Sequence, residues 1–297
     1  MRTIGRLILS AVFLLLTAAL VAAAVYVPGF FDFYTPLSRD AAAFLSGAFA
    51  SFPFAVWQVF LALLVLASLY ALVRSFVKKR GFLCWLAGLV CLFSLLVLVF
   101  TALWGLHHWA PPVADRLGLE VGEYSKEELT QTTVYLAQQA SAWSEKVPRE
   151  PDSDMTVDLS AIAKTAGAAF APLAQQNSFF DGPHHPVKTL LGGKIFSYLG
   201  LTGIYICYTG ESCVNPDTYP ASVPYTMCHE VAHRLSVAGE DEANFCAFLA
   251  CTASQGPAFV YSGWYSAFIH CYNALFAADR EAALAIRAAL SPAMDND

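Results

Sequence analysis

The sequence predicts a membrane-anchored α+β protein, in which three N-terminal transmembrane helices precede a mainly helical domain with a small sheet. Two observations predict this fold class. Of the 297 residues, 57% are hydrophobic and only 13% are charged, whereas a soluble domain carries about 25% charged residues. The charge is also unevenly spread, with seven basic and two acidic residues in 1–108 but ten and twenty-one in 109–297. An apolar, basic first third and an acidic remainder are typical of a membrane anchor joined to a water-facing domain.

Three apolar runs are each long enough to cross a bilayer, which takes about 20 residues. They span about residues 8–27, 55–77 and 82–106. Basic residues precede the first run and fill the turn at 78–80, so the positive-inside rule places these ends in the cytoplasm. Everything after Trp109 is then expected outside the cytoplasmic membrane, in a multi-pass protein. Residues 1–24 also resemble a signal peptide, but their apolar stretch is longer than usual and favours an uncleaved anchor.

The predicted domains are a transmembrane anchor over 1–110 and an extracytoplasmic domain over 111–297. The lipid bilayer is the predicted partner of the anchor, and a nucleic acid is excluded because the net charge is −6 and no basic stripe exists. A loop is expected between the first two spans. In the second domain, periodicity and capping signals predict helices at 124–147, 157–176, 226–236, 240–253 and 257–278, a short final helix after Asp279, and one or two strands within 187–214.

The helix expected at 257–278 is apolar enough to be a fourth span. It carries Tyr261, Tyr265, His270 and Asn273, which are costly in lipid but ordinary in a protein core. It is therefore predicted to be a buried helix of the second domain. A domain cut near Pro112 is expected to fold alone if that domain has a core of its own.

The residues that carry chemistry are the run His229-Glu-Val-Ala-His233. On a helix, positions i and i+4 share one face, so both imidazoles can bind one metal ion while Glu230 lies beside it. A zinc ion in such a site activates a water, and Glu230 would accept the proton as the water attacks a carbonyl carbon. The competing interpretation is an amphipathic helix whose histidines lie in the core. The spacing favours the metal.

Two histidines leave a catalytic zinc one protein ligand short. The next helix begins Glu240-Asp-Glu-Ala-Asn244, and a short turn can bring one of its acidic side chains back to the metal. In glutamate-type zincins a second helix carries Glu-x-x-Ala/Ser-Asp, and Glu240, Ala243 and Asn244 resemble that register. The resemblance implies Glu240 as the third ligand, with Asn244 accepting a hydrogen bond from a metal-binding histidine. Glu242 is the alternative ligand, and the competing role of these carboxylates is to cap the helix N-terminus.

Further motifs accompany this pair of helices. They are Thr209-Gly-Glu211, Val214-Asn215, Leu249-Ala-Cys251 and Tyr261-Ser-Gly263. With the histidine run and the segment from Glu240 to Phe245, they resemble the bacterial family called domain of unknown function 3810 (DUF3810). Where its members carry Phe-Thr before the histidine run, this chain has Tyr225-Thr226. The resemblance implies N-terminal membrane spans and a C-terminal zincin-like metallopeptidase domain, but no substrate. It implies one zinc ion, bound by His229, His233 and Glu240, with Glu230 as general base.

The function predicted from these observations is a zinc-dependent metallopeptidase that hydrolyses peptide bonds outside the cytoplasmic membrane. The alternative is a membrane sensor or scaffold whose domain binds a metal or a peptide without turnover, because Asn244 stands where an acid is usual. An intramembrane protease is disfavoured, since Arg234 directly follows the motif. The strand at 203–208 precedes the metal helix, where an extended peptide can pair with its edge.

Other side chains are candidates for the same site, each with a packing role as its competitor. Tyr225, Tyr261, Tyr265 and His270 are candidate donors to an oxyanion. The segment from Thr209 to Glu211, together with Asn215, is a candidate lining of the cleft. Cys207 and Cys213 are six residues apart and would be able to bridge in an oxidising compartment.

Overall fold

The computed structural model describes residues 3–79, 81–150 and 154–297. Helices account for 71% of the described residues, which also contain one small three-stranded sheet, so the protein is mainly helical as predicted. The chain divides into two compact units. The first holds residues 1–110 together with 206–211, and the second holds 111–205 and 212–297. A short segment from the C-terminal half of the sequence thus belongs to the first unit.

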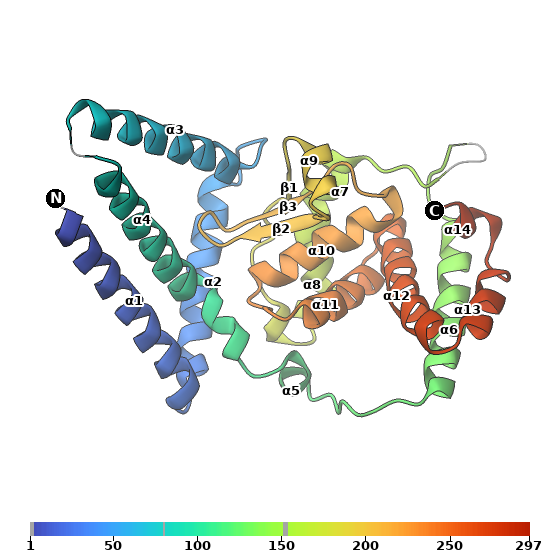
Figure 1. Ribbon diagram of the computed structural model, residues 1–297. Helices are drawn as coiled ribbons and strands as arrows, with labels where there is room; N and C mark the ends of the chain where they lie inside the picture. Colours follow the sequence, from blue (N-terminus) through green and yellow to red (C-terminus); the bar gives the residue numbers. More distant parts are fainter. Residues whose placement is uncertain (1–2, 80, 151–153) are drawn as a thin grey trace. The chain divides into compact units, whose positions relative to one another are not determined.

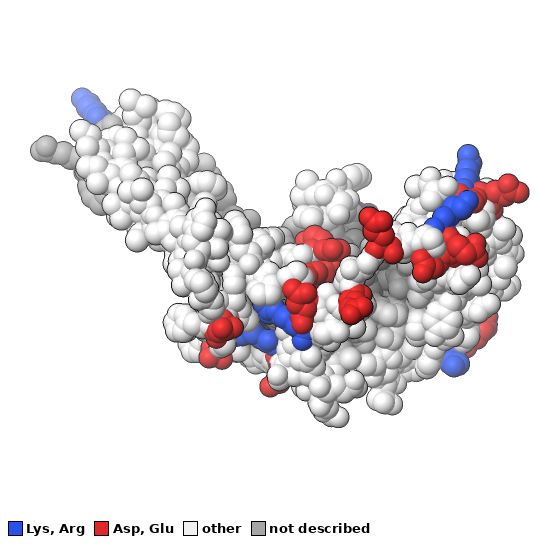
Figure 2. Space-filling view, turned by 90° about the horizontal axis from the view of Figure 1, so that it is seen from below, with Lys and Arg blue, Asp and Glu red and all other residues white. Residues whose placement is uncertain are grey.

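Four helices make up most of the first unit (Figure 1). They are α1 (Thr3–Tyr26), α2 (Phe30–Phe49), α3 (Val56–Val77) and α4 (Phe82–Leu103), followed by the 3-10 helix η1 (Gly105–Trp109). Of the helices in the described part of the chain, α1, α3 and α4 are long and apolar enough to cross a membrane. Three helices of the predicted kind are therefore present. In Figure 2, the part of the surface at the left of the view carries hardly any charged side chain. Such a surface is what contact with lipid requires.

Helix α2 lies where the sequence predicts a loop, and this prediction is wrong. Its buried residues recur at every fourth position, namely Tyr34, Ser38, Ala42 and Ser46. The buried face is thus made of small and polar side chains, which a search for apolar periodicity does not detect. Tyr34 stacks on Phe30, and its hydroxyl donates a hydrogen bond to the carbonyl oxygen of Thr101 in α4.

Residues 206–211 pack among the helices of the first unit. The buried carboxylate of Glu211 accepts hydrogen bonds of 2.9 Å from the backbone N–H groups of Val56 and Trp57, at the first turn of α3. The hydroxyl of Tyr208 donates to the carbonyl oxygen of Leu96 in α4. Gly210 has φ +65°, and a Cβ there would lie 2.6 Å from a backbone nitrogen of α2. The segment therefore fits against three helices at once.

The second unit contains the remaining elements. They are α5 (Val113–Leu117), α6 (Lys126–Ser144), α7 (Leu159–Thr165), η2 (Ala166–Phe170), α8 (Ala171–Ala174), η3 (Ser178–Phe180), β1 (Lys188–Thr189), α9 (Gly193–Tyr198), β2 (Gly203–Ile206), β3 (Glu211–Val214), η4 (Pro220–Ser222), α10 (Val223–Arg234), α11 (Glu240–Ala253), α12 (Pro257–Ala278), α13 (Arg280–Arg287) and α14 (Pro292–Asn296). The last residue of β2 and the first of β3 are counted with the first unit.

The sheet has the strand order β1-β3-β2, with β1 parallel to β3. Strand β3 is fully buried, whereas the residues of β2, at one edge, are half-buried. Strand β2 is therefore an edge strand of this sheet. The sequence predicts one or two strands within 187–214, and the structure has three there, of which β1 is the shortest.

Helices α10, α11 and α12 pack against one another and form the core of the second unit. The predicted bounds of α11 and α12 are confirmed. Helix α12 packs against α6 and is not among the described helices that are long and apolar enough to cross a membrane. The capping box predicted at the start of α6 is present between Ser125 and Glu128. The side chain of Asp279 caps α13, as expected.

The sequence predicts one continuous helix over 157–176. The segment is helical, but it is divided into α7, η2 and α8, so the prediction of a single helix is wrong. The break falls at Gly167, where a Cβ would lie 2.9 Å from the Cα of His184. The close approach of that loop requires glycine and changes the helical geometry. No disulfide joins Cys207 to Cys213, and both thiols are buried.

Candidate metal centre

Helix α10 positions the two histidines. Pro224 occupies its first turn, where the missing N–H has no helical partner in any case. His229 and His233 follow one turn apart, with ring centroids separated by 4.6 Å and the two Nε2 atoms by 3.0 Å. The histidine run therefore presents both rings on one side of the helix.

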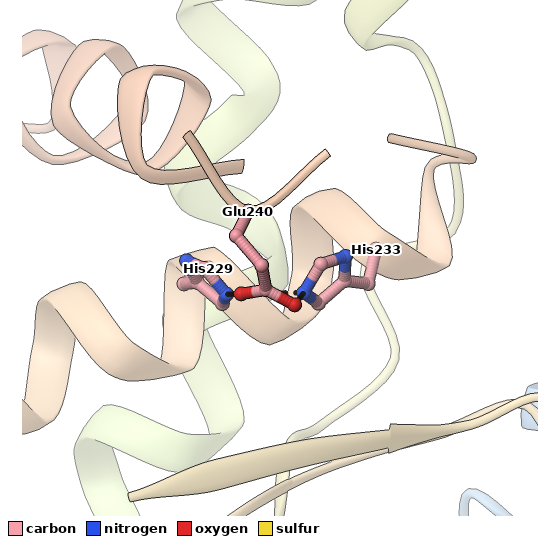
Figure 3. A group of neighbouring side chains, drawn as sticks. All are labelled: His229, His233 and Glu240. Carbon is pink, nitrogen blue, oxygen red and sulfur yellow. Dashed lines mark hydrogen bonds and ion pairs between the residues drawn. The ribbon is translucent and has the colours of Figure 1, made fainter. Parts of the chain in front are cut away.

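The third side chain comes from the first residue of α11. Between the helices the chain turns at Ser236, which adopts the left-handed φ of +72°. This turn returns the chain so that Glu240 faces the histidines (Figure 3). Its Oε2 lies 3.1 Å from Nε2 of His229, and its Oε1 lies 3.7 Å from Nε2 of His233. One atom from each of the three side chains lies within 4.8 Å of the others.

The Nδ1 atom of each imidazole ring is hydrogen-bonded to an oxygen. Nδ1 of His229 lies 2.9 Å from Oδ1 of Asn244, and Nδ1 of His233 lies 2.7 Å from the carbonyl oxygen of Val237. Both oxygens are acceptors, so each Nδ1 carries the ring proton and donates. In the neutral form of either ring, Nε2 then has a lone pair that faces the other ring and Glu240.

Burial and the neighbouring His233 lower the pKa of His229 to about 4, so this ring is neutral at pH 7. One atom of each imidazole and of the carboxylate converge here, and the nitrogen of His229 is unprotonated. A cation between these three atoms would accept their lone pairs. Two imidazole nitrogens and one carboxylate oxygen suit zinc and leave a fourth tetrahedral position open, so the donor set fits that ion.

Glu230 lies beside this cluster and is 5% exposed. Burial, with a further contribution from the negative Glu240, raises the pKa of its carboxyl well above the ordinary value. Among the described residues, Oε2 has no hydrogen-bond partner, and such an unsatisfied buried oxygen is costly. It is therefore the atom of this site that most needs a proton or a further ligand.

Strand β2 approaches Glu230 closely at Gly203. A Cβ at this position would lie 2.5 Å from Oε1 of Glu230, so any larger residue would displace the carboxylate or the strand. The hydroxyl of Ser212 in β3 donates to the carbonyl oxygen of Glu230, which attaches the sheet to α10. Three residues of the site, Gly203, Ser212 and Val237, are not predicted from the sequence. A glycine at the start of a strand is a weak signal for such an approach, and a backbone carbonyl gives none.

The structure places several other candidates away from the cluster. Oε1 of Glu242, the alternative ligand, accepts a hydrogen bond of 2.6 Å from the backbone N–H of Val113 and so caps α5. The hydroxyl of Tyr225 donates to the carbonyl oxygen of Asn244. Those of Tyr261 and Tyr265 donate to Asp297.

Three further candidates have structural roles. His270 lies against Tyr225, with ring centroids 6.2 Å apart, and burial lowers its pKa. The amide of Asn215 bonds Ser197 and the backbone of its own turn, and Glu211 caps α3. Asn215 and Glu211 therefore have the packing role that competed with lining the cleft.

A family model described as a protein of unknown function, DUF3810, matches residues 33–297 of the chain. The chain belongs to this family. The match covers most of the chain and includes His229, Glu230, His233 and Glu240, so the centre lies within the DUF3810 region. Comparison with curated proteins and with solved structures gave no match.

Proposed function

We propose that this DUF3810 protein is a zinc-dependent metallopeptidase of the glutamate-zincin type, anchored in the cytoplasmic membrane with its second unit outside the cytoplasm. The observation that carries the proposal is the convergence of three ligand atoms, from His229, His233 and Glu240, beside a buried Glu230. Zinc bound there would polarise a substrate carbonyl and bring the pKa of a coordinated water near 7.

The side chains around the centre have separate tasks in this proposal. Asn244 and Val237 hold the two imidazoles in the orientation and tautomer that coordination needs. Glu230 takes up the proton released during attack and passes it to the leaving amine. A nearby dication would counter the burial that raises the pKa of Glu230, so that the carboxylate form becomes available.

The position of β2 at an edge of the sheet supports a peptide as the substrate class. Gly203, at the start of this strand, lies directly against Glu230. A peptide paired with the strand would therefore pass close to the proposed base. The identity of the peptide or protein substrate does not follow from these contacts.

One observation favours the alternative of a sensor or scaffold that binds metal or peptide without turnover. Glu230 is only 5% exposed and lies under Gly203, so its access to a substrate is restricted. The two functions share the metal and differ in hydrolysis. The same set of variants therefore separates them.

The test is metal content by mass spectrometry, together with hydrolysis of a peptide library, on the full chain purified in detergent. We expect one zinc per chain, and a clear loss of zinc in His233→Ala and Glu240→Ala. Asp241→Ala is the matched control, because this exposed carboxylate adjoins Glu240 but is outside the cluster. Glu230→Gln is expected to retain zinc and to lower hydrolysis by about 10²–10⁴-fold.

The possible outcomes separate the hypotheses. A folded parent without metal would overturn the peptidase and the metal-binding scaffold together. Zinc retained in Glu240→Ala would exclude this carboxylate as the third ligand. Zinc in the parent, with no hydrolysis that depends on Glu230, would leave the sensor or scaffold.

A further inference from the structure

A cavity of about 490 Å³ lies among α1, α3 and α4, entirely within the first unit. Its lining comes from the start of α1, from the C-terminal half of α3 and from the first half of α4. Helix α3 contacts α4 more sparsely than α1 does, which leaves this space between them. A volume of this size is typical of a small-molecule site.

One end of the cavity is strongly basic. Arg6, Arg74 and Lys78 line it, and its lining includes no acidic side chain. None of the three forms an ion pair with a described carboxylate. The only acidic residues in 1–110 are Asp32 and Asp40, and both belong to α2, which does not line the cavity. Three cations around one cavity without a counter-charge repel one another, and an anion would relieve that repulsion.

Arg6 is fixed in place at this end. Its Nη1 donates to the carbonyl oxygen of Cys84 and is within 3.5 Å of the sulfur of that residue. Gly88 makes room for the guanidinium, since a Cβ there would lie 3.1 Å from Nη1. The other guanidinium nitrogens bond no described residue. A seated arginine with donors to spare is well suited to bind a phosphate.

The other end of the cavity is apolar. Leu64, Leu89 and Leu92 line it, and Trp85 and Tyr70 lie between the two ends. The indole of Trp85 donates to the carbonyl oxygen of Ser68, which fixes the ring in the wall. Along α3, Leu64 and Arg74 are about 15 Å apart at the ~1.5 Å rise per residue. That is about half the ~30 Å thickness of a hydrocarbon core, the depth of one leaflet.

We propose that this cavity binds an anionic phospholipid, with its phosphate between Arg6, Arg74 and Lys78 and its acyl chains along Leu64, Leu89 and Leu92. A ligand that is negative at one end and apolar for one leaflet depth matches the polarity of the lining. The basic end coincides with the ends of α1 and α3 that the positive-inside rule assigns to the cytoplasm, where anionic lipids are concentrated. A free phosphate would engage the basic end alone.

The test uses Trp85 as a reporter in the full chain, reconstituted into phosphatidylcholine vesicles. Either brominated phosphatidylglycerol or brominated phosphatidylcholine is added at equal mole fraction, and the quenching of tryptophan emission is recorded. Subtracting the signal of Trp85→Phe isolates Trp85 from the other five tryptophans. We expect the brominated phosphatidylglycerol to quench Trp85 at a lower mole fraction than the brominated phosphatidylcholine.

The double variant Arg74→Gln/Lys78→Gln should weaken this preference by about 30-fold, because each cation contributes about fivefold to the binding of an anionic lipid. Lys79→Gln is the matched control, since Lys79 adjoins Lys78 and is exposed but does not line the cavity. Its preference should equal that of the parent.

Three results would overturn the proposal. Equal quenching of Trp85 in the parent by the two brominated lipids would exclude headgroup recognition. An unchanged preference in a folded double variant would exclude the basic end. Relief of the quenching by millimolar inorganic phosphate would show that the site takes free phosphate rather than a lipid.

Discussion

In the candidate metal centre, the Nδ1 atom of one histidine ring is hydrogen-bonded to a side chain and that of the other to a backbone carbonyl. His233 donates to the backbone carbonyl of Val237, which no substitution removes, whereas His229 donates to the side chain of Asn244. We expect Asn244→Ala to weaken zinc binding by about 10–100-fold, because the ring of His229 loses the group that sets its tautomer. Asn244→Asp should bind zinc at least as tightly as the parent, since a carboxylate is the stronger acceptor. Chelator competition measures both.

The exposed Asn273 of α12 supplies a control for these two variants. Asn273→Ala removes the same amide from a position outside the cluster and should leave the affinity unchanged. If Asn244→Ala binds zinc as tightly as the parent, Asn244 does not orient His229.

Gly203 is the residue of the sheet on which the site depends most directly. In Gly203→Ala, the new Cβ would be 2.5 Å from Oε1 of Glu230, so the carboxylate or the strand must move. We expect hydrolysis to fall by at least about tenfold, since small displacements of a catalytic group are costly. The zinc content should be unchanged, because the three atoms nearest to the new Cβ all belong to Glu230.

Gly122→Ala is the control for this substitution, as a Cβ there would meet nothing within 4 Å. Hydrolysis by Gly203→Ala at the parental rate would mean that the position of Glu230 does not limit the reaction. Loss of zinc in the same variant would instead show that the strand supports the metal ligands.

At the scale of single residues, the sequence predicts those parts of the site whose geometry is local. The spacing of His229 and His233 within one helix is sufficient to predict that their rings meet. Glu240 is separated from the histidines by a turn, so spacing alone does not favour it over Glu242 as the third ligand. That preference comes from the resemblance to the Glu-x-x-Ala/Ser-Asp pattern of glutamate-type zincins. The roles of Val237 and Gly203 depend on a backbone carbonyl and on a contact between distant segments, which spacing does not encode. Tyr225 shows the same limit, because a position on α10 does not reveal which way its hydroxyl points.

Among the elements, the turn between β2 and β3 has a role that its sequence does not reveal. Glu211 is 3% exposed, and both of its oxygens accept hydrogen bonds from the first N–H groups of α3. A carboxylate at this position satisfies orphan donors and interacts favourably with the helix dipole. We expect Glu211→Ala to lower the stability of the full chain by about 2 kcal/mol, at the upper end for the loss of a cap. Thermal unfolding in detergent micelles measures the change.

The exposed Glu123 provides the control, because Glu123→Ala removes a carboxylate that caps no helix and should leave the transition unchanged. An unaltered transition in Glu211→Ala would show that water replaces the cap without cost. The contacts of this turn also bear on the expectation that a domain cut near Pro112 folds alone. Such a fragment would carry residues 206–211 without the helices against which they pack.

The elements that the sequence predicts best are those with one dominant signal. Helices α3, α4, α11 and α12 follow from long apolar runs or from Gly and Pro at their ends, and their bounds agree within a few residues. Helix α2 is not predicted, because its buried face is made of serine, alanine and tyrosine and shows no apolar periodicity. The predicted helix at 157–176 fails at Gly167, where the approach of a distant loop overrides local propensity.

For the molecule as a whole, the proposal depends on the side of the membrane on which the second unit lies. The charges of the first unit favour one orientation, since its basic residues concentrate at the start of α1 and around the turn between α3 and α4. We expect Glu123→Cys to react with a membrane-impermeant maleimide in intact cells, and Lys79→Cys to react only after permeabilisation. The parent chain supplies the background, because six of its eight cysteines are buried and the other two are half-buried. The opposite pattern would place the metal centre in the cytoplasm and contradict an extracytoplasmic peptidase, while leaving the zinc site itself intact.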